Sequence, residues 1–202
     1  MRIIGGKARG RKLWPLTGKQ TRPTPDRVRE ALFSILRAKL TEARVLDLFA
    51  GTGALGLEAI SRGAQEAVFV EHDRRAVVTL RKNVMSLGLG GTVLCMPAPR
   101  ALDHLASQGA AFDLVFLDPP YASALWLPTL QHLAQKRLLN DEAIVVCEHP
   151  NALQTIEAQR PFQKIDRRHW GNVAVTLLRC DVPQRTLPPN RPQGTEERDC
   201  KA

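Results

Sequence analysis

Long hydrophobic runs are missing from this sequence of 202 residues. No stretch approaches the roughly 20 consecutive apolar residues that a helix needs to cross a bilayer, so we expect no membrane-spanning segment. The first six residues also lack the apolar segment and small-residue cleavage site of a secretory signal. These absences predict a cytoplasmic protein. The apolar fraction of 44% is nevertheless sufficient for one folded domain with its own core.

Cysteine is scarce as well. None of the four cysteines forms a C-x-x-C pair, and no H-x-x-x-H spacing accompanies them, so we expect no zinc site and no bound metal. Cys95, Cys147 and Cys180 lie in apolar, strand-like segments and are predicted to be buried thiols, whereas Cys200 lies in the tail.

Acidic residues are outnumbered, and the net charge is +9. The excess is concentrated in residues 1–30, which hold nine basic and two acidic residues. A basic segment of this kind is typical of proteins that bind the phosphate backbone of nucleic acids, although a solvated segment that only aids solubility would look the same. The candidate contacts are Lys7, Arg9, Arg11, Lys12, Arg22 and Arg27.

The first 20 residues are predicted to form a small basic hairpin. Ile3 and Ile4 can pair with residues 12–14 across a basic loop that contains glycines. Trp14 has two interpretations. Its ring could stack on a base, but packing of the hairpin on the main domain is favoured, because tryptophan is mostly buried.

Beyond the hairpin, strand-like and helix-like segments alternate. Strands are predicted at 44–49, 67–71, 92–96, 112–117 and 143–147, and helices at 24–40, 55–62, 74–87, 100–107, 125–139 and near Leu153. This alternation predicts an α/β fold with a mostly parallel sheet covered by helices on both faces. Two further strands, at 162–168 and 173–178, flank the turn sequence WGN and predict a C-terminal antiparallel hairpin. The expected organisation is a hairpin at 1–20, one domain at 21–182 and a disordered, proline-rich tail at 183–202.

The first strand runs into a glycine-rich loop. Residues 47–56 read DLFAGTGALG, and a loop of this kind after a first strand marks a nucleotide-like cofactor site. The spacing of Gly51, Gly53 and Gly56 also fits a dinucleotide fingerprint, with Glu71 at the expected offset for a ribose-binding acid. Asp47 inside the strand instead favours a methyltransferase, where an acid at this place faces the amino-acid end of the methyl donor. Phe49 belongs to the same motif.

The fourth strand ends in the sequence Asp118-Pro119-Pro120-Tyr121. The lone pair of an exocyclic base amine is delocalised into the ring, so the amine is a poor nucleophile. The carboxylate of Asp118 and the carbonyl of Pro119 can accept both amine hydrogens and hold the nitrogen in line with an electrophilic methyl group. Proline fixes the backbone and brings no competing N–H, and Tyr121 can stack on the extruded base. A plain Pro-Pro turn is the alternative.

The second strand ends in Glu71, which is predicted to accept hydrogen bonds from ribose hydroxyls. His72 follows it and either lines an adenine pocket or lies on the surface. The other histidines show no triad or ligand spacing and are interpreted as structural or solvated.

Four segments together resemble the RsmD-like family of bacterial guanine-N2 methyltransferases of 16S ribosomal RNA. They are residues 2–13 (RIIGGKARGRKL), 22–30 (RPTPDRVRE), 47–56 and 118–121. The resemblance implies a Rossmann-like class I methyltransferase with a seven-stranded sheet, and S-adenosylmethionine as the methyl donor. It also implies that Thr24, Arg27 and Glu30 lie beside the cofactor or the target base, with helix capping and surface pairing as the alternative.

One segment departs from the family pattern. Related enzymes often carry a polar residue for the adenine amine after the third strand, whereas this chain reads MPAPR at 96–100. Adenine contacts are therefore expected from the backbone, at Ala98.

The expected function is methylation of the N2 amine of a guanine in ribosomal RNA, within a small-subunit particle, by a monomer. Rival interpretations stay open. They are an adenine-N6 or protein-glutamine methyltransferase, a nicotinamide-dependent oxidoreductase that uses the glycine loop, and a non-catalytic RNA-binding module.

Overall fold

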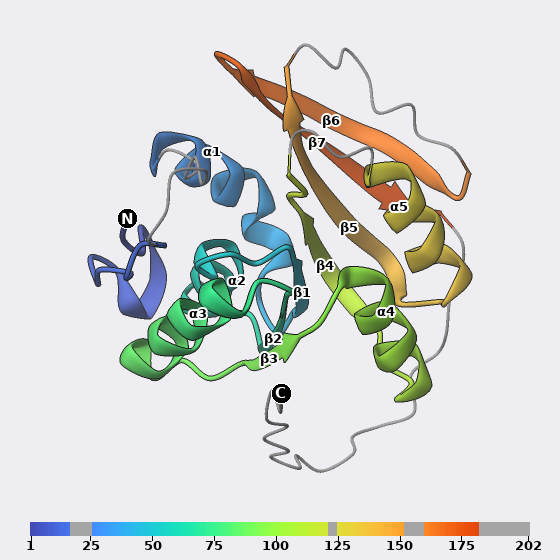
Figure 1. The fold of residues 1–202 in the computed structure, drawn as a ribbon. Coiled ribbons are helices and arrows are strands. Elements are labelled where there is room, and N and C mark those ends of the chain that lie inside the picture. The colour runs from blue at the N-terminus through green and yellow to red at the C-terminus, as the bar shows by residue number, and fades with distance from the viewer. Residues whose placement is uncertain (17–25, 121–124, 152–159, 182–202) are drawn as a thin grey trace.

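The computed structural model describes residues 1–16, 26–120, 125–151 and 160–181. A seven-stranded sheet runs through the molecule, with α1, α2 and α3 on one face and α4 and α5 on the other (Figure 1). The helices are α1 (Asp26–Ile35), α2 (Ala54–Ser61), α3 (Arg74–Leu87), α4 (Ala98–Ser107) and α5 (Trp126–Gln135), with 3₁₀ turns η1 (Gly6–Ala8) and η2 (Leu36–Lys39). The strands are β1 (Arg44–Leu48), β2 (Glu66–Glu71), β3 (Thr92–Cys95), β4 (Phe112–Leu117), β5 (Leu139–Pro150), β6 (Phe162–Trp170) and β7 (Val173–Cys180).

The strand order is β3-β2-β1-β4-β5-β7-β6. Strands β1 to β5 are parallel to their neighbours, while β7 runs antiparallel to both β5 and β6. The predicted fold class is therefore confirmed, including the reversed C-terminal hairpin. The strand order reverses between β1 and β4, because β2 and β3 lie on one side of β1 while β4 and β5 lie on the other. In sheets of this kind, ligands bind at the point of reversal, outside the carboxyl ends of the strands.

The central strands are apolar on both sides because helices cover both faces of the sheet. Val45 and Phe116 belong to the core beneath α1, α2 and α3, whereas Leu46 and Leu117 belong to the core beneath α4 and α5. Successive residues of one strand thus point into the two cores on opposite faces of the sheet, because side chains alternate along a strand.

The N-terminal hairpin exists but is short. It has one bridge, Arg2 to Lys12, supported by a 2.9 Å hydrogen bond from the Ile3 N–H to the Arg11 carbonyl. Ile3, Ala8 and Leu13 are buried in the same core as α1, α2 and α3. The described part of the predicted extension is therefore fixed to the main body of the protein.

Glu58 of α2 anchors this hairpin. Its buried carboxylate accepts the N–H groups of Ile4 and Gly5, each at 2.7 Å, and the guanidinium of Arg62 at 2.6 Å. The approach is close at Gly6 also, since a Cβ there would lie 1.7 Å from the carbonyl oxygen of Ser61. Gly6 is thus required by its contact with the backbone of α2.

Trp14 differs from the favoured interpretation in the position of its ring. Its backbone packs on α3, where its N–H donates to Asn83 Oδ1 at 2.7 Å. The ring itself is 51% exposed, and the Lys82 ammonium lies 3.3 Å from the ring centroid. The expected packing of the hairpin is confirmed, but burial of the tryptophan ring is wrong.

The predicted helix at 125–139 is too long. Helix α5 ends at Gln135, and β5 begins at Leu139 and extends to Pro150, well beyond the predicted 143–147. Arg137 has a φ of 52°, which breaks the helix, and Leu138 then enters the core beneath α4 and α5. The apolar pair at 138–139 fits a helix stripe and a buried strand equally well, so periodicity alone assigned it wrongly.

The predicted burial of cysteines is confirmed at Cys147 and Cys180, while Cys95 is partly exposed. The expected helix near Leu153, the tail at 183–202 and Cys200 lie outside the described residues. Among the helices of the described part, none is long and apolar enough to span a membrane.

Candidate functional site

The glycine loop and the Asp-Pro-Pro segment meet at one edge of the sheet. Leu48, the last residue of β1, pairs in register with Leu117, the last residue of β4. The following residues, Phe49 and Asp118, therefore leave adjacent parallel strands side by side. Two motifs that are about 70 residues apart in sequence thus share one site, because the carboxyl ends of parallel strands lie at the same edge.

Asp47 lies beneath this edge and is almost fully enclosed, with 2% of its surface exposed. Its Oδ2 accepts a 2.9 Å hydrogen bond from the Gly56 N–H in α2. Burial raises the pKa of this carboxyl from 3.8 to about 7; the nearby charge of Glu71 adds to the increase, and the hydrogen bond from Gly56 opposes it. An adjacent cation would favour the ionised form.

The glycine loop is shaped by contacts behind it. Gly53 has a φ of 78°, and a Cβ there would lie 2.4 Å from Leu80 Cδ1; a Cβ on Gly56 would lie 2.4 Å from Phe69 Cε1. In front of Gly51, by contrast, the nearest atom to a built Cβ is 3.9 Å away. The loop is therefore packed tightly against α3 and β2 while its outer side stays open to a ligand.

Phe49 adopts a left-handed conformation with a φ of 63°. This conformation is unfavourable for a bulky residue and is typical of functional sites, where surrounding structure holds it. The ring lines a cavity at the edge of the sheet. Phe49 therefore connects the loop after β1 to this cavity.

The cavity has a volume of about 270 Å³ and lies between the ends of β1 and β2 and the start of α4 and α5. Three residues predicted to bind the cofactor, Phe49, His72 and Ala98, line it. The remaining lining residues are Pro97, Pro99, Leu102, Leu125, Pro128, Thr129 and His132. These walls are mainly apolar and suit a flat aromatic ring such as adenine.

Ala98 is the first residue of α4, so its N–H has no acceptor within the helix. This N–H lies at the end of the helix that borders the cavity. The next residue, Pro99, has no N–H to offer. A backbone donor at Ala98 agrees with the expectation from the sequence that no polar side chain serves the adenine at this place.

Glu71 ties two loops together. Its Oε2 accepts the Gly51 N–H at 3.0 Å, and its Oε1 accepts the N–H groups of His72 and Asp73 at 2.8 and 2.9 Å. Oε1 thus already accepts two hydrogen bonds, whereas Oε2 keeps the capacity to accept a ribose hydroxyl. The His72 side chain is 63% exposed and lies at the rim of the cavity.

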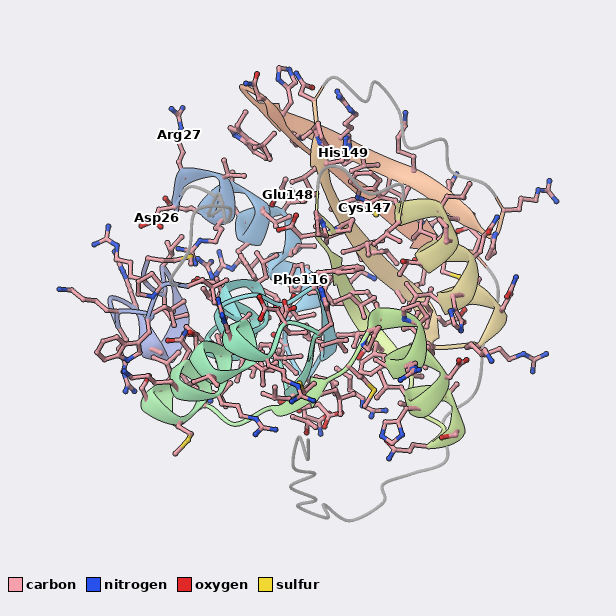
Figure 2. The ribbon with its side chains drawn as sticks, viewed as in Figure 1. Asp26, Arg27, Phe116, Cys147, Glu148 and His149 are labelled. Carbon is pink, nitrogen blue, oxygen red and sulfur yellow. The ribbon has the colours of Figure 1, made fainter. Side chains whose placement is uncertain are left out.

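Asp118 has two acidic neighbours, Glu148 and Asp47. Burial raises the pKa of its carboxyl well above 3.8, and the charges of Glu148 and Asp47 raise it further. Glu148 is the residue after Cys147, which pairs with Leu117 in the adjacent strand. Figure 2 shows Glu148 on the side of β5 that faces α1. Both acidic neighbours therefore favour a cationic ligand at this edge.

Glu148 is the functional candidate that the sequence analysis missed. The only signal was an acid directly after the buried strand at 143–147, at the place where Asp118 follows the fourth strand. In the structure it is 6% exposed. Of the predicted catalytic segment, Pro119 is buried and Pro120 is exposed, and Tyr121 lies outside the described residues.

His149 has a structural role, as expected. Its buried ring donates from Nδ1 to the Pro150 carbonyl at 3.0 Å, and Nε2 accepts from the Thr176 hydroxyl at 2.9 Å. Burial lowers the pKa of the ring, so the neutral tautomer that makes these bonds is favoured. In the described residues no group of three or more histidine, cysteine, aspartate or glutamate side chains is arranged to hold a metal ion.

The predicted RNA contacts divide into two groups. Lys7, Arg9 and Lys12 are exposed on the hairpin, and Arg27 projects from the start of α1 into solvent (Figure 2). Arg11 instead donates to the carbonyls of Ser86 and Leu87 at the end of α3, so it caps that helix. Arg22 and Thr24 lie outside the described residues.

Comparison with known proteins then identifies the family. The model of a family described as Conserved hypothetical protein 95, the RsmD-like family, matches residues 1–179. The chain belongs to this family. The Escherichia coli K12 protein named ribosomal RNA small subunit methyltransferase D is 42% identical over 179 residues, which cover 88% of each chain. A Haemophilus influenzae protein of the same name is 36% identical over 172 residues and 84% of each chain.

Solved structures agree with the RsmD-like assignment. The structure of yhhF from Escherichia coli superposes with a TM-score of 0.79 at 38% identity, covering 90% of this chain and 98% of that chain. The resemblance inferred from residues 2–13, 22–30, 47–56 and 118–121 is thereby confirmed.

Proposed function

We propose that this protein transfers a methyl group from S-adenosylmethionine to the N2 amine of a guanine in small-subunit ribosomal RNA. Its relatives in the RsmD-like family are named as methyltransferases of that RNA. The observation that carries the proposal is the register of β1 and β4, which places the Asp118-Pro119 segment beside the glycine loop. The enzyme is proposed to act in the cytoplasm as a monomer.

The described residues fit the methyl donor. The apolar cavity lined by Phe49, His72 and Ala98 suits the adenine, and Glu71 lies where it can accept the ribose hydroxyls. Asp47 is buried near the end of β1, where it can face the ammonium group of the cofactor's amino-acid portion. When bound, S-adenosylmethionine supplies a methyl carbon that its sulfonium makes electrophilic.

The residues of the chain then act on the acceptor. Asp118 and the Pro119 carbonyl accept the two hydrogens of the guanine amine and orient its lone pair towards the methyl carbon. Tyr121 stacks on the base. Methylation gives an acidic ammonium, and Asp118 is positioned to accept the proton that this group loses. The nearby acids Asp47 and Glu148 stabilise the positive charge that resides on the donor before transfer and on the amine after it.

The Asp118→Ala variant tests the assigned role. Radiolabelled S-adenosylmethionine is supplied with deproteinised small-subunit RNA and, separately, with assembled subunits. We expect label in the RNA with the wild-type protein and a loss of at least about 100-fold in the variant, the range for removal of one transition-state contact. Cofactor affinity measured by calorimetry should change only a few-fold, because Asp118 contacts the acceptor.

Asp181→Ala is the control, since Asp181 is an exposed acid paired with Arg179 at the opposite end of the sheet from Asp118. It should methylate at the wild-type rate. Unchanged methylation by Asp118→Ala would show that the Asp-Pro-Pro segment does not hold the acceptor, and tight binding of NADH instead of S-adenosylmethionine would favour an oxidoreductase.

A further inference from the structure

A second concave surface lies between α1 and the end of β6. It is a groove of about 500 Å³, and its lining residues are Ala31, Ile35, Arg167, Arg168, His169 and Trp170. One wall is a helix of the N-terminal half and the other is the C-terminal hairpin. None of these residues belongs to the proposed cofactor pocket, so the groove needs its own explanation.

The groove opens at the same sheet edge as Asp118. In the antiparallel pairings, Glu148 lies opposite Val175, and Val175 lies opposite Arg168. Neighbouring strands are about 4.8 Å apart, so the backbone of Arg168 is roughly 10 Å from that of Glu148, and Asp118 is one strand further. A nucleotide next to a base held at Asp118 can therefore reach the groove.

The floor of the groove is apolar and includes an aromatic ring. Trp170 is half-buried and packs against the core beneath α1, while Ile35 is among the exposed large hydrophobic residues. A partly exposed tryptophan beside aliphatic groups is the kind of surface on which nucleic-acid bases stack without sequence preference.

The rim carries cations on both walls. Arg27 precedes Ala31 by four residues and Ile35 by eight, so these three residues lie along one face of α1. Arg27 is exposed at the start of this row (Figure 2). On the opposite wall, the Arg168 side chain is 58% exposed, and its Nε donates to Asp166 at 3.0 Å. Its terminal nitrogens can therefore still approach a phosphate while Asp166 fixes the stem of the guanidinium group.

We propose that this groove binds a single-stranded RNA segment that flanks the methylated nucleotide, with one base stacked on Trp170 and phosphates held by Arg27 and Arg168. The charge of the rim complements a phosphodiester backbone, and the apolar floor complements a base. The proposal rests on the proposed function in taking RNA as the substrate, and it assigns to the C-terminal hairpin a role in substrate binding.

Two substitutions of the same residue isolate stacking. Trp170→Leu keeps an apolar side chain but removes the π-face, whereas Trp170→Phe keeps a smaller aromatic face. Binding of a fluorescein-labelled, mixed-sequence single-stranded RNA oligonucleotide is measured by anisotropy. We expect Trp170→Leu to weaken binding about 10-fold or more, and Trp170→Phe to restore most of the loss, because a base stacks on an aromatic face and not on an aliphatic side chain. The KM for ribosomal RNA should rise in parallel, while kcat and the affinity for S-adenosylmethionine stay near wild type.

A matched pair of arginines isolates the charge. Arg168 and Arg179 lie on the same hairpin, and each pairs through Nε with an aspartate two residues away. Arg179 lies at the opposite end of the sheet, where it pairs with Ile144. Arg168→Ala should weaken RNA binding several-fold and reduce the slope of log affinity against log salt by about 1, whereas Arg179→Ala should change neither.

The outcomes separate the groove from the proposed function. Wild-type methylation of RNA with unchanged KM and oligonucleotide affinity in Trp170→Leu overturns the groove alone. Oligonucleotide binding that depends on Trp170, without any methyl transfer to RNA by the wild-type protein, supports the groove and overturns the proposed function. Equal losses of RNA affinity in the Leu and Phe variants overturn the stacking proposal. A loss that is seen with assembled subunits but not with free RNA also overturns it, in favour of a contact with a ribosomal protein.

Discussion

Replacing Asp47 by asparagine should stabilise the fold while weakening cofactor binding. In the folded protein, burial raises the pKa of Asp47 from 3.8 to about 7. Below pH 3.8 the carboxyl is protonated in both the folded and unfolded states, so its ionisation does not lower the stability of the fold. Between pH 3.8 and 7 the unfolded chain is ionised while the folded chain keeps its proton, so the free energy of unfolding falls as the pH rises, and the loss is complete above pH 7. The difference between the two pKa values corresponds to about 4 kcal/mol above pH 8.

Asparagine has nearly the same shape, and its Oδ1 can accept the Gly56 N–H as the carboxylate does. The variant should therefore gain about 4 kcal/mol at pH 8, which is about 10 °C in Tm for a protein of this size, and should gain little at pH 4. At the same time it loses a charged acceptor for the amino-acid portion of S-adenosylmethionine, and we expect affinity to fall about 10- to 100-fold.

The assay is thermal unfolding followed by calorimetry at pH 4 and pH 8 without cofactor, with isothermal titration of S-adenosylmethionine at pH 8. The control is Asp181→Asn, which alters an exposed acid that pairs with Arg179 outside the proposed site and should leave cofactor affinity unchanged. A variant that is less stable than wild type at pH 8, or that binds the cofactor equally well, would refute the reasoning. In either case the buried acid could not be a residue that destabilises the fold and is retained for the ligand.

Two further predictions concern the catalytic edge and the hairpin. Glu148→Gln removes a charge that raises the pKa of Asp118. The acidic limb of the pH–rate profile, where Asp118 becomes protonated and inactive, should therefore move to lower pH. A limb that does not move would exclude electrostatic coupling between the two residues. Gly6→Ala places a Cβ against the Ser61 carbonyl and should release the hairpin from α2, which protease sensitivity near the N-terminus and weaker RNA binding would report. Gly10→Ala is its control, since Gly10 also has a positive φ but no atom lies within 4 Å of a built Cβ; equal effects of the two would deny the contact any importance.

The architecture was predictable because its strands are buried on both faces. Segments such as 44–48 (RVLDL) and 112–117 (FDLVFL) are mostly apolar, and helices with an apolar stripe separate the strands. The position of the glycine loop and of Asp118 at one edge follows from the same fold class, because both come directly after parallel strands. The error at 138–139 arose where burial, and not periodicity, decides between helix and strand.

Features that depend on register or on packing between distant elements could not be predicted. Glu148 becomes a neighbour of Asp118 only because Cys147 pairs with Leu117, and one residue of slip would turn its side chain to the other face. The groove between Ile35 and Trp170 joins segments about 135 residues apart, and nothing in either segment alone indicates the other. These relations are set by the tertiary fold.

The most direct test of the central claim is to identify the methylated nucleoside. Small-subunit ribosomal RNA is incubated with the wild-type protein and isotopically labelled S-adenosylmethionine, digested completely, and separated by liquid chromatography with mass detection. The proposed alignment of a guanine amine at Asp118 and Pro119 predicts that the label is in N2-methylguanosine. Label in N6-methyladenosine, or none in any nucleoside of RNA supplied free or in assembled subunits, would contradict it.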